Sequence, residues 1–140
     1  MSDPEAQIIK QLLVDLRDFN KAKRRAAVMK LGMVGGDEAV QALIMMVRND
    51  HEDLIARGRA ALMLGNLRDI RAVDSLIKAL DAPGFQTPVY AAEALGKIGD
   101  RRAIEPLLLA AANSGNDTFR KAIMEALKRL GHDPEKVPME

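Results

Sequence analysis

The stretch AAEALGKIGD, residues Ala91–Asp100, with RRAIEPLLLAAA directly behind it, decides the fold. It indicates a short apolar helix that ends at a glycine, a tight Gly-Asp turn and a second apolar helix. Weaker copies begin at Ala26, Ala60 and Ala122. Leucines recur in these copies at spacings of 33, 31 and 32 residues, as Leu31, Leu64, Leu95 and Leu127. Such a period predicts stacked helix pairs, because one pair is too thin to bury both of its faces.

Other apolar residues also recur at fixed places in the second helix of each copy. Three positions repeat, namely Ala39, Ala72 and Ala103, then Val40, Val73 and Ile104, then Leu43, Leu76 and Leu107. We expect alanines of the first helices to let neighbouring backbones approach closely. The branched residues of the second helices are then expected to fill the space between the layers.

The composition limits the possible classes of protein. The chain has 140 residues, 3% aromatic residues, two histidines, no cysteine and a net charge of +1. The absence of cysteine excludes disulfides and thiolate metal sites, and the small net charge gives no general attraction to nucleic acid or membrane. No apolar run approaches the roughly 20 residues that span a bilayer. The N-terminus MSDPEAQ lacks the features of a signal peptide, so we expect a cytoplasmic protein.

The pattern predicts an all-α fold, a right-handed α-solenoid of about seven helices in one domain, residues 1–134. Its parts are a capping helix at 4–18, repeats at about 20–48, 51–81 and 87–113, a last helix at 117–130, and a tail at 135–140. In the third repeat Thr87 and Pro88 indicate an N-cap and the first helical residue, which predicts a shortened first helix. Pro106 predicts a late start or a slight kink in the next helix.

The pattern R-x-x-A-A-x-x-L-G-x-x-G-D-x-x-A-[VI]-x-x-L resembles the HEAT-like repeats of the phycobilisome-lyase type, over roughly Ile8 to Gly131. Those repeats are helix hairpins of about 30 residues, shorter than the usual HEAT length of roughly 40–47. The resemblance implies that an arginine of the first helix and an aspartate of the turn tie neighbouring repeats. The matching residues are Arg24, Arg57 and Arg120, and Asp69 and Asp100. Pro88, Gly36 and His132 occupy the positions that depart from this pattern.

Two rows of residues are predicted on the exposed side of the second helices. One row is Val14, Met45, Lys78 and Leu109, and the neighbouring row is Lys10, Gln41, Asp74 and Glu105. In stacked hairpins of this kind the second helices line the concave face. An apolar strip with a polar rim is a surface that a partner helix or peptide can use. The alternative is that neighbouring side chains half cover the strip and that it has no role.

The remaining motifs each have two interpretations. The run Lys21, Lys23, Arg24 and Arg25 is either a contact for nucleic acid or an acidic partner, or a solvated helix face. The three repeat arginines either bind phosphates or pair with acids between layers. His51-Glu52 matches the His-Glu pairs of HEAT-like di-iron hydroxylases, but those enzymes need several pairs and this chain has one. We therefore predict no metal, no cofactor and no catalytic set.

The favoured hypothesis is a non-catalytic scaffold that binds a partner protein or peptide on the concave face, as a monomer or weak homodimer. A second hypothesis, which the resemblance implies, is a subunit of a bilin lyase-like enzyme that handles a tetrapyrrole. A third is a DNA-binding solenoid similar to HEAT-like alkylpurine glycosylases, although the small net charge and the lack of tryptophan argue against it.

Overall fold

The computed structural model describes residues 3–133, which form α-helices and two short 3-10 turns without any strand. The elements are α1 (Pro4–Asp15), α2 (Lys21–Val34), α3 (Asp37–Arg48), α4 (Leu54–Leu67), η1 (Ile70–Ala72), α5 (Val73–Ala79), α6 (Gln86–Ile98), η2 (Arg101–Ala103), α7 (Ile104–Ala112) and α8 (Asp117–Arg129). The all-α prediction is confirmed, with eight α-helices in this part of the chain in place of about seven.

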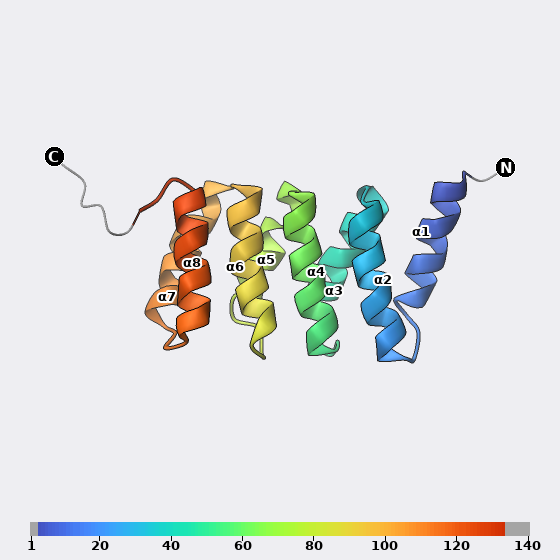
Figure 1. The fold of residues 1–140 in the computed structure, drawn as a ribbon, viewed down its shortest axis with the longest axis horizontal. Helices are drawn as coiled ribbons and strands as arrows, with labels where there is room; N and C mark the ends of the chain where they lie inside the picture. Colours follow the sequence, from blue (N-terminus) through green and yellow to red (C-terminus); the bar gives the residue numbers. More distant parts are fainter. Residues whose placement is uncertain (1–2, 134–140) are drawn as a thin grey trace.

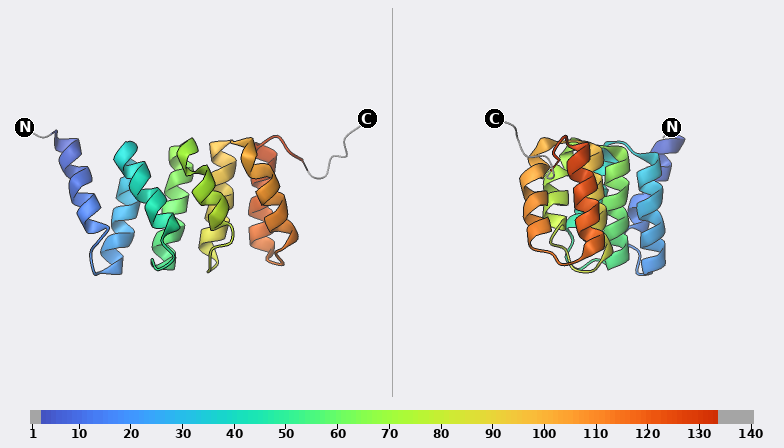
Figure 2. Two further views of the ribbon diagram at one scale, coloured as in Figure 1. Left: turned by 180° about the vertical axis from the view of Figure 1, so that it is seen from behind. Right: turned by 60° about the vertical axis from the view of Figure 1, so that its left-hand side comes forward.

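The helices stand side by side in two layers, as expected for a solenoid. In Figure 1, α2, α4, α6 and α8 form the front layer, with α3, α5 and α7 behind them. Figure 2 shows the second layer from behind. Helix α1 packs against α2 and α3 at the N-terminal end, in the place predicted for a capping helix.

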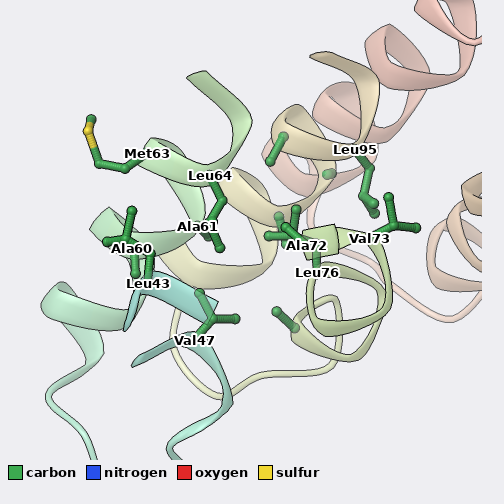
Figure 3. Packing of buried hydrophobic residues seen from close by; sticks show 14 of the residues in the cluster. Leu43, Val47, Ala60, Ala61, Met63, Leu64, Ala72, Val73, Leu76 and Leu95 are labelled. Carbon is green, nitrogen blue, oxygen red and sulfur yellow. The ribbon is translucent and has the colours of Figure 1, made fainter. Parts of the chain in front are cut away.

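The core lies between the two layers and is built from the repeated positions of the sequence (Figure 3). The four leucines of the first helices are fully buried at 0% exposure, and so are the three alanines and three leucines that recur on the second helices. The repeat alignment therefore identified these core positions correctly, although Ile104, aligned with buried Val40 and Val73, is only partly buried.

Glycines set the spacing of the first layer. A Cβ added to Gly65 of α4 would lie 2.7 Å from Ala94 Cα of α6. A Cβ added to Gly96 of α6 would lie 2.8 Å from Ala126 Cα of α8. Since normal carbon contacts are about 3.5–4.0 Å, these helices approach closer than any side chain at the two glycines would allow. The sequence interpretation assigned this close approach to alanines alone.

The first helix of each repeat ends at a residue with positive φ. Gly35, Gly99 and Gly131 have φ of 71°, 82° and 79°, and Arg68 at the equivalent place has φ of 53°. Glycine has no Cβ and adopts this conformation without steric penalty, which explains why three of the four copies carry it. Arg68 is the only non-glycine residue among residues 3–133 with positive φ.

The structure corrects the predicted start of the third repeat. Helix α6 begins at Gln86, so Thr87 is not the N-cap but the second helical residue. Thr87 is buried, and its hydroxyl donates to the Leu54 carbonyl at 3.4 Å. The helix has 13 residues against 14 in α4, so the shortening is one residue.

Pro106 is accommodated by a late helix start, one of the two predicted outcomes. The chain passes through the 3-10 turn η2 before α7 begins at Ile104, which makes Pro106 its third residue. The missing N–H of proline is tolerated there, because the first N–H groups of a helix have no partner within it. The domain limits stay a prediction, and the predicted tail at 135–140 lies outside the described residues.

Candidate partner-binding face

The residues predicted on the outer side of the second helices are all exposed. They lie in pairs four residues apart on α1, α3, α5 and α7, a spacing that puts both members of a pair on one side of a helix. We call this surface the second-helix face, defined by Lys10, Val14, Gln41, Met45, Asp74, Lys78, Glu105 and Leu109. Its apolar members are Val14, Met45 and Leu109, with exposed fractions of 61%, 71% and 64%.

A hollow of about 760 Å³ lies between α5 and α7 on this face. Its walls are largely apolar and its rim carries two carboxylates, and the lining residues are Ile77, Leu80, Asp81, Glu105, Pro106, Leu108, Leu109, Ala110 and Asn113. The sequence had indicated Glu105 and Leu109 but not the hollow. A hollow depends on how far neighbouring helices lie apart, which no single repeat position encodes.

Two of the three repeat arginines tie a first helix to the chain before it. Arg57 of α4 is 3% exposed, and its Nε and Nη2 donate to the Val47 carbonyl at 3.1 and 2.9 Å. Arg24 of α2 donates from Nη1 to the carbonyls of Asp18 and Phe19, at 2.8 and 3.0 Å. These arginines therefore satisfy backbone carbonyls at or just beyond the end of the preceding helix, in addition to contacting acids.

Arg120, the last of the three repeat arginines, does not form the expected link to the preceding repeat. Arg120 of α8 is exposed, and its side chain makes no hydrogen bond or ion pair with residues 3–133. Arg24 does have a carboxylate partner, because its Nε donates to Glu52 at 3.1 Å. Arg57 lies 3.7 Å from Asp50, which is an ion-pair distance too long for a hydrogen bond.

The turn aspartates act on their own turns and reach the neighbouring repeat through an arginine. Asp69 accepts a hydrogen bond from the backbone N–H of Arg71 at 2.9 Å and also binds the Arg71 side chain. The same guanidinium then contacts Asp37 of the previous repeat at 3.1 Å. Hydrogen bonding from the Arg71 side chain lowers the pKa of Asp69. The motif gave the aspartate but not the arginine that completes the link.

The second turn repeats this arrangement. Asp100 accepts from the backbone N–H of Arg102 at 2.9 Å, and the Arg102 side chain, which donates to it, lowers its pKa. Arg102 also lies 3.6 Å from Asp74 of the previous repeat. Asp74 of the second-helix face therefore has an exposed cationic neighbour.

A further inter-repeat pair was missed from the sequence. Asp53 is the N-cap of α4, where its carboxylate accepts from the Ala56 N–H at 3.0 Å. Arg25 of α2 forms a two-point contact with this carboxylate, with Nη2 2.7 Å from Oδ1. The hydrogen bonds from Arg25 lower the pKa of Asp53 to about 2. The signal was present as an aspartate just before a helix and an arginine 28 residues earlier.

The basic cluster is mostly paired with acids. Arg24 and Arg25 bind Glu52 and Asp53, and Lys23 lies 3.5 Å from Asp18. The Lys21 side chain makes no hydrogen bond or ion pair with the described residues. The cluster therefore leaves little free positive charge, and it gives no support to the DNA-binding hypothesis.

His51 and Glu52 do not sit in a cluster of metal-binding side chains. His51 is exposed, while Glu52 accepts the hydrogen bond from Arg24. Within residues 3–133, no three His, Cys, Asp or Glu side chains gather closely enough to hold a metal ion. None of the described helices is long and apolar enough to cross a membrane.

Comparison with known proteins gives matches in family and in structure. The family model described as HEAT repeats matches residues 9–87 and 76–139. The structure of the CpcE–CpcF complex of phycocyanin lyase from Nostoc sp. PCC7120 is similar at 26% identity and a TM-score of 0.76, covering 88% of this chain and 53% of that chain. Human deoxyhypusine hydroxylase in complex with glycerol is similar at 25% identity and a TM-score of 0.70, covering 96% and 49%.

An engineered protein shares the fold, with 18% identity, a TM-score of 0.61 and coverage of 91% of this chain and 64% of that chain. No curated protein matches the sequence. The chain spans about half the length of the lyase and hydroxylase chains that it resembles.

Proposed function

Because the chain belongs to the HEAT repeat family, we propose that it is a non-catalytic scaffold that binds a segment of a partner protein on the second-helix face. Helical repeat arrays present extended surfaces that suit this role. The observation that carries the proposal is the apolar hollow between α5 and α7, next to exposed apolar side chains of the same face.

The apolar side chains supply the anchoring part of the interaction. Met45 and Leu109 are 71% and 64% exposed, so each has surface left to bury against a partner. Covering apolar surface contributes about 25 cal/mol per Å² before the costs of association. A methionine also adapts to differently shaped partners, since its side chain is unbranched and flexible.

The rim charges favour a particular kind of partner. Asp81 and Glu105 border the hollow, and neither side-chain carboxylate makes a hydrogen bond or ion pair with the described residues. A segment that places an apolar side chain in the hollow and a lysine or arginine beside it would match both features. We therefore favour an amphipathic helix or extended segment with basic flanks as the bound element.

The experiment compares proteins captured from the native lysate by three forms of the chain. The double variant Met45→Glu with Leu109→Glu should lose the specific partner and keep the thermal unfolding midpoint, because both side chains are exposed. Met33→Glu is the matched control, since Met33 is 82% exposed but lies on α2 of the other layer. Equal capture by the double variant and the wild type would show that the second-helix face is not the binding surface.

A second candidate function is that of a lyase-like subunit, favoured by the similarity to the phycocyanin lyase complex. In that case the chain would act together with a second subunit and would contact a bilin. The test mixes bilin with the purified wild-type chain and, separately, with the double variant, and records the absorption spectrum of each mixture. An unchanged spectrum at all concentrations argues against a bilin-binding role for the isolated chain.

A further inference from the structure

One nitrogen of the buried Arg57 guanidinium has no protein hydrogen-bond acceptor among the described residues. Its Nε and Nη2 are committed to the Val47 carbonyl, while buried Nη1 has no acceptor among the described residues. Leaving a buried charged donor unpaired is expensive, because its hydration is lost without replacement. Nη2 carries two N–H groups, so it can donate to a second acceptor in addition to the Val47 carbonyl.

Arg57 lines a cavity of about 300 Å³ between the ends of α3 and α5 and the first turns of α4. Polar and charged side chains dominate its lining, which consists of Val47, Arg48, Asp50, Arg57, Ser75, Lys78, Ala79, Asp81, Ala82 and Pro83. Ser75 is 7% exposed, and its hydroxyl makes no hydrogen bond with the described residues. The cavity therefore holds a second buried donor besides the arginine.

The charges around the cavity favour an anion. Three cationic side chains line it, those of Arg48, Arg57 and Lys78, against the carboxylates of Asp50 and Asp81. The Asp50 side chain is 87% exposed and stays 3.7 Å from Nη2, so water screens its attraction to the guanidinium. The net formal charge of the lining side chains is therefore +1, and Arg57 is the most buried of the charged residues.

We propose that this cavity binds a two-oxygen anionic group, a carboxylate or a phosphate, beside the buried guanidinium of Arg57. The Ser75 hydroxyl and the Lys78 ammonium group are the additional donors. This proposal does not depend on the proposed partner-binding function, because a free anion would occupy the cavity in the same way. If the anionic group belongs to a bound protein, Lys78 links this cavity to the second-helix face.

Within the described residues no other repeat arginine has a buried unpaired nitrogen, which argues against a general property of the fold. The Nη1 of Arg24 donates to two backbone carbonyls, Pro88 replaces the arginine in the third repeat, and Arg120 is exposed. The unpaired buried nitrogen is therefore particular to the second repeat within residues 3–133. The competing occupants are Asp50, if it turns inward, and ordinary water.

The test is a titration followed by amide chemical shifts at constant ionic strength and pH. Inorganic phosphate, acetate and N-acetylglycine are added in place of chloride, the last as a mimic of a peptide C-terminus. We expect a saturable shift at Ser75, Lys78 and Ala82 with one or more of the three anions. The anion that binds most tightly identifies the source, and the absence of a saturable shift with all three overturns the proposal.

Variants separate specific binding from general screening. Ser75→Ala should weaken binding about fivefold through loss of one hydrogen bond, and Lys78→Ala roughly threefold through loss of an exposed charge. Lys121→Ala is the control, because Lys121 is exposed on α8 and carries the same charge. Equal weakening in the control and in Lys78→Ala, or none in Ser75→Ala, contradicts the proposal.

Asp50→Asn distinguishes the anion from an internal partner. If an external anion occupies the cavity, removing the Asp50 charge should tighten binding, roughly threefold for an exposed charge. If Asp50 itself neutralises Arg57, the wild type should show no saturable shift, and Asp50→Asn should lower the unfolding midpoint and create anion binding. That second result overturns the proposal.

Discussion

Two glycines of helix α4 give opposite predictions for the same substitution. A Cβ added to Gly58 would lie 3.4 Å from Gln86 Cβ and 3.5 Å from the nearest atoms of Thr87 and Tyr90, which are ordinary contact distances. A Cβ added to Gly65 would lie 2.7 and 2.8 Å from Cα and Cβ of Ala94. Gly58→Ala therefore fills available space, whereas Gly65→Ala forces α4 away from α6.

The magnitudes follow from two competing effects. Replacing glycine by alanine inside a helix stabilises by about 1 kcal/mol, because the unfolded chain loses less freedom on folding. Overpacking a well-packed contact costs about 1–3 kcal/mol, and the helices would have to separate by about 1 Å to restore a normal carbon contact. We expect Gly58→Ala to raise the free energy of unfolding by about 0.5–1 kcal/mol and Gly65→Ala to lower it by ~1–2 kcal/mol.

The assay is urea unfolding followed by far-UV circular dichroism, with the free energy of unfolding extrapolated to water. Gly115→Ala is the control, because an added Cβ there meets no atom within 4 Å, and it should change stability by less than about 0.5 kcal/mol. If Gly65→Ala stabilises as much as Gly58→Ala, the glycine contact does not set the spacing of the first layer.

The remaining predictions use the same unfolding assay. Arg57→Met should lower the free energy of unfolding by about 1–3 kcal/mol, because the Val47 carbonyl loses its charged donor, while Arg120→Met at the equivalent position should be nearly neutral. Arg68→Gly should stabilise by about 1 kcal/mol, because Arg68 has φ of 53°; a loss of stability would show that the arginine side chain matters more than its backbone. Asp53 has a pKa of about 2 in the folded protein against its ordinary value of 3.8, so the unfolded chain takes up the proton first and stability should fall as the pH drops from about 4 to 2. Asp53→Asn should flatten that part of the pH profile, and an unchanged slope would contradict the ion pair with Arg25.

The sequence predicted the repeated core because every copy carries the same apolar spacing. Leu31, Leu64, Leu95 and Leu127 were aligned from the sequence, and all are fully buried. The outward side of the second helices could be predicted for the same reason, since a helix with one buried side must expose the other. Its role in binding stays a prediction.

Interactions that join two different repeats were harder to predict. The Arg25–Asp53 pair and the link from Asp69 through Arg71 to Asp37 depend on side-chain directions across a layer. The motif names a residue type at a position, but the partner is fixed only when the layers are stacked. The same limit explains Arg120, which occupies the correct repeat position but whose side chain makes no hydrogen bond or ion pair in the described chain.

The start of α6 was misplaced for a local reason. Thr-Pro is a strong N-cap signal, because the hydroxyl accepts an N–H and the proline suits the first helical residue. Here Thr87 instead donates to the Leu54 carbonyl of the preceding repeat and is buried. A tertiary hydrogen bond therefore outweighed the local preference by one residue.

The glycine contacts of the first layer have a consequence for how this molecule could change. Gly65 and Gly96 hold α4, α6 and α8 together through backbone-level contacts. The exposed residues of α5 and α7 contribute little to that stacking. Substitutions that reshape the surface for a new ligand can therefore accumulate on the layer that contains α5 and α7. The layer of α4, α6 and α8 meanwhile keeps the repeats in register.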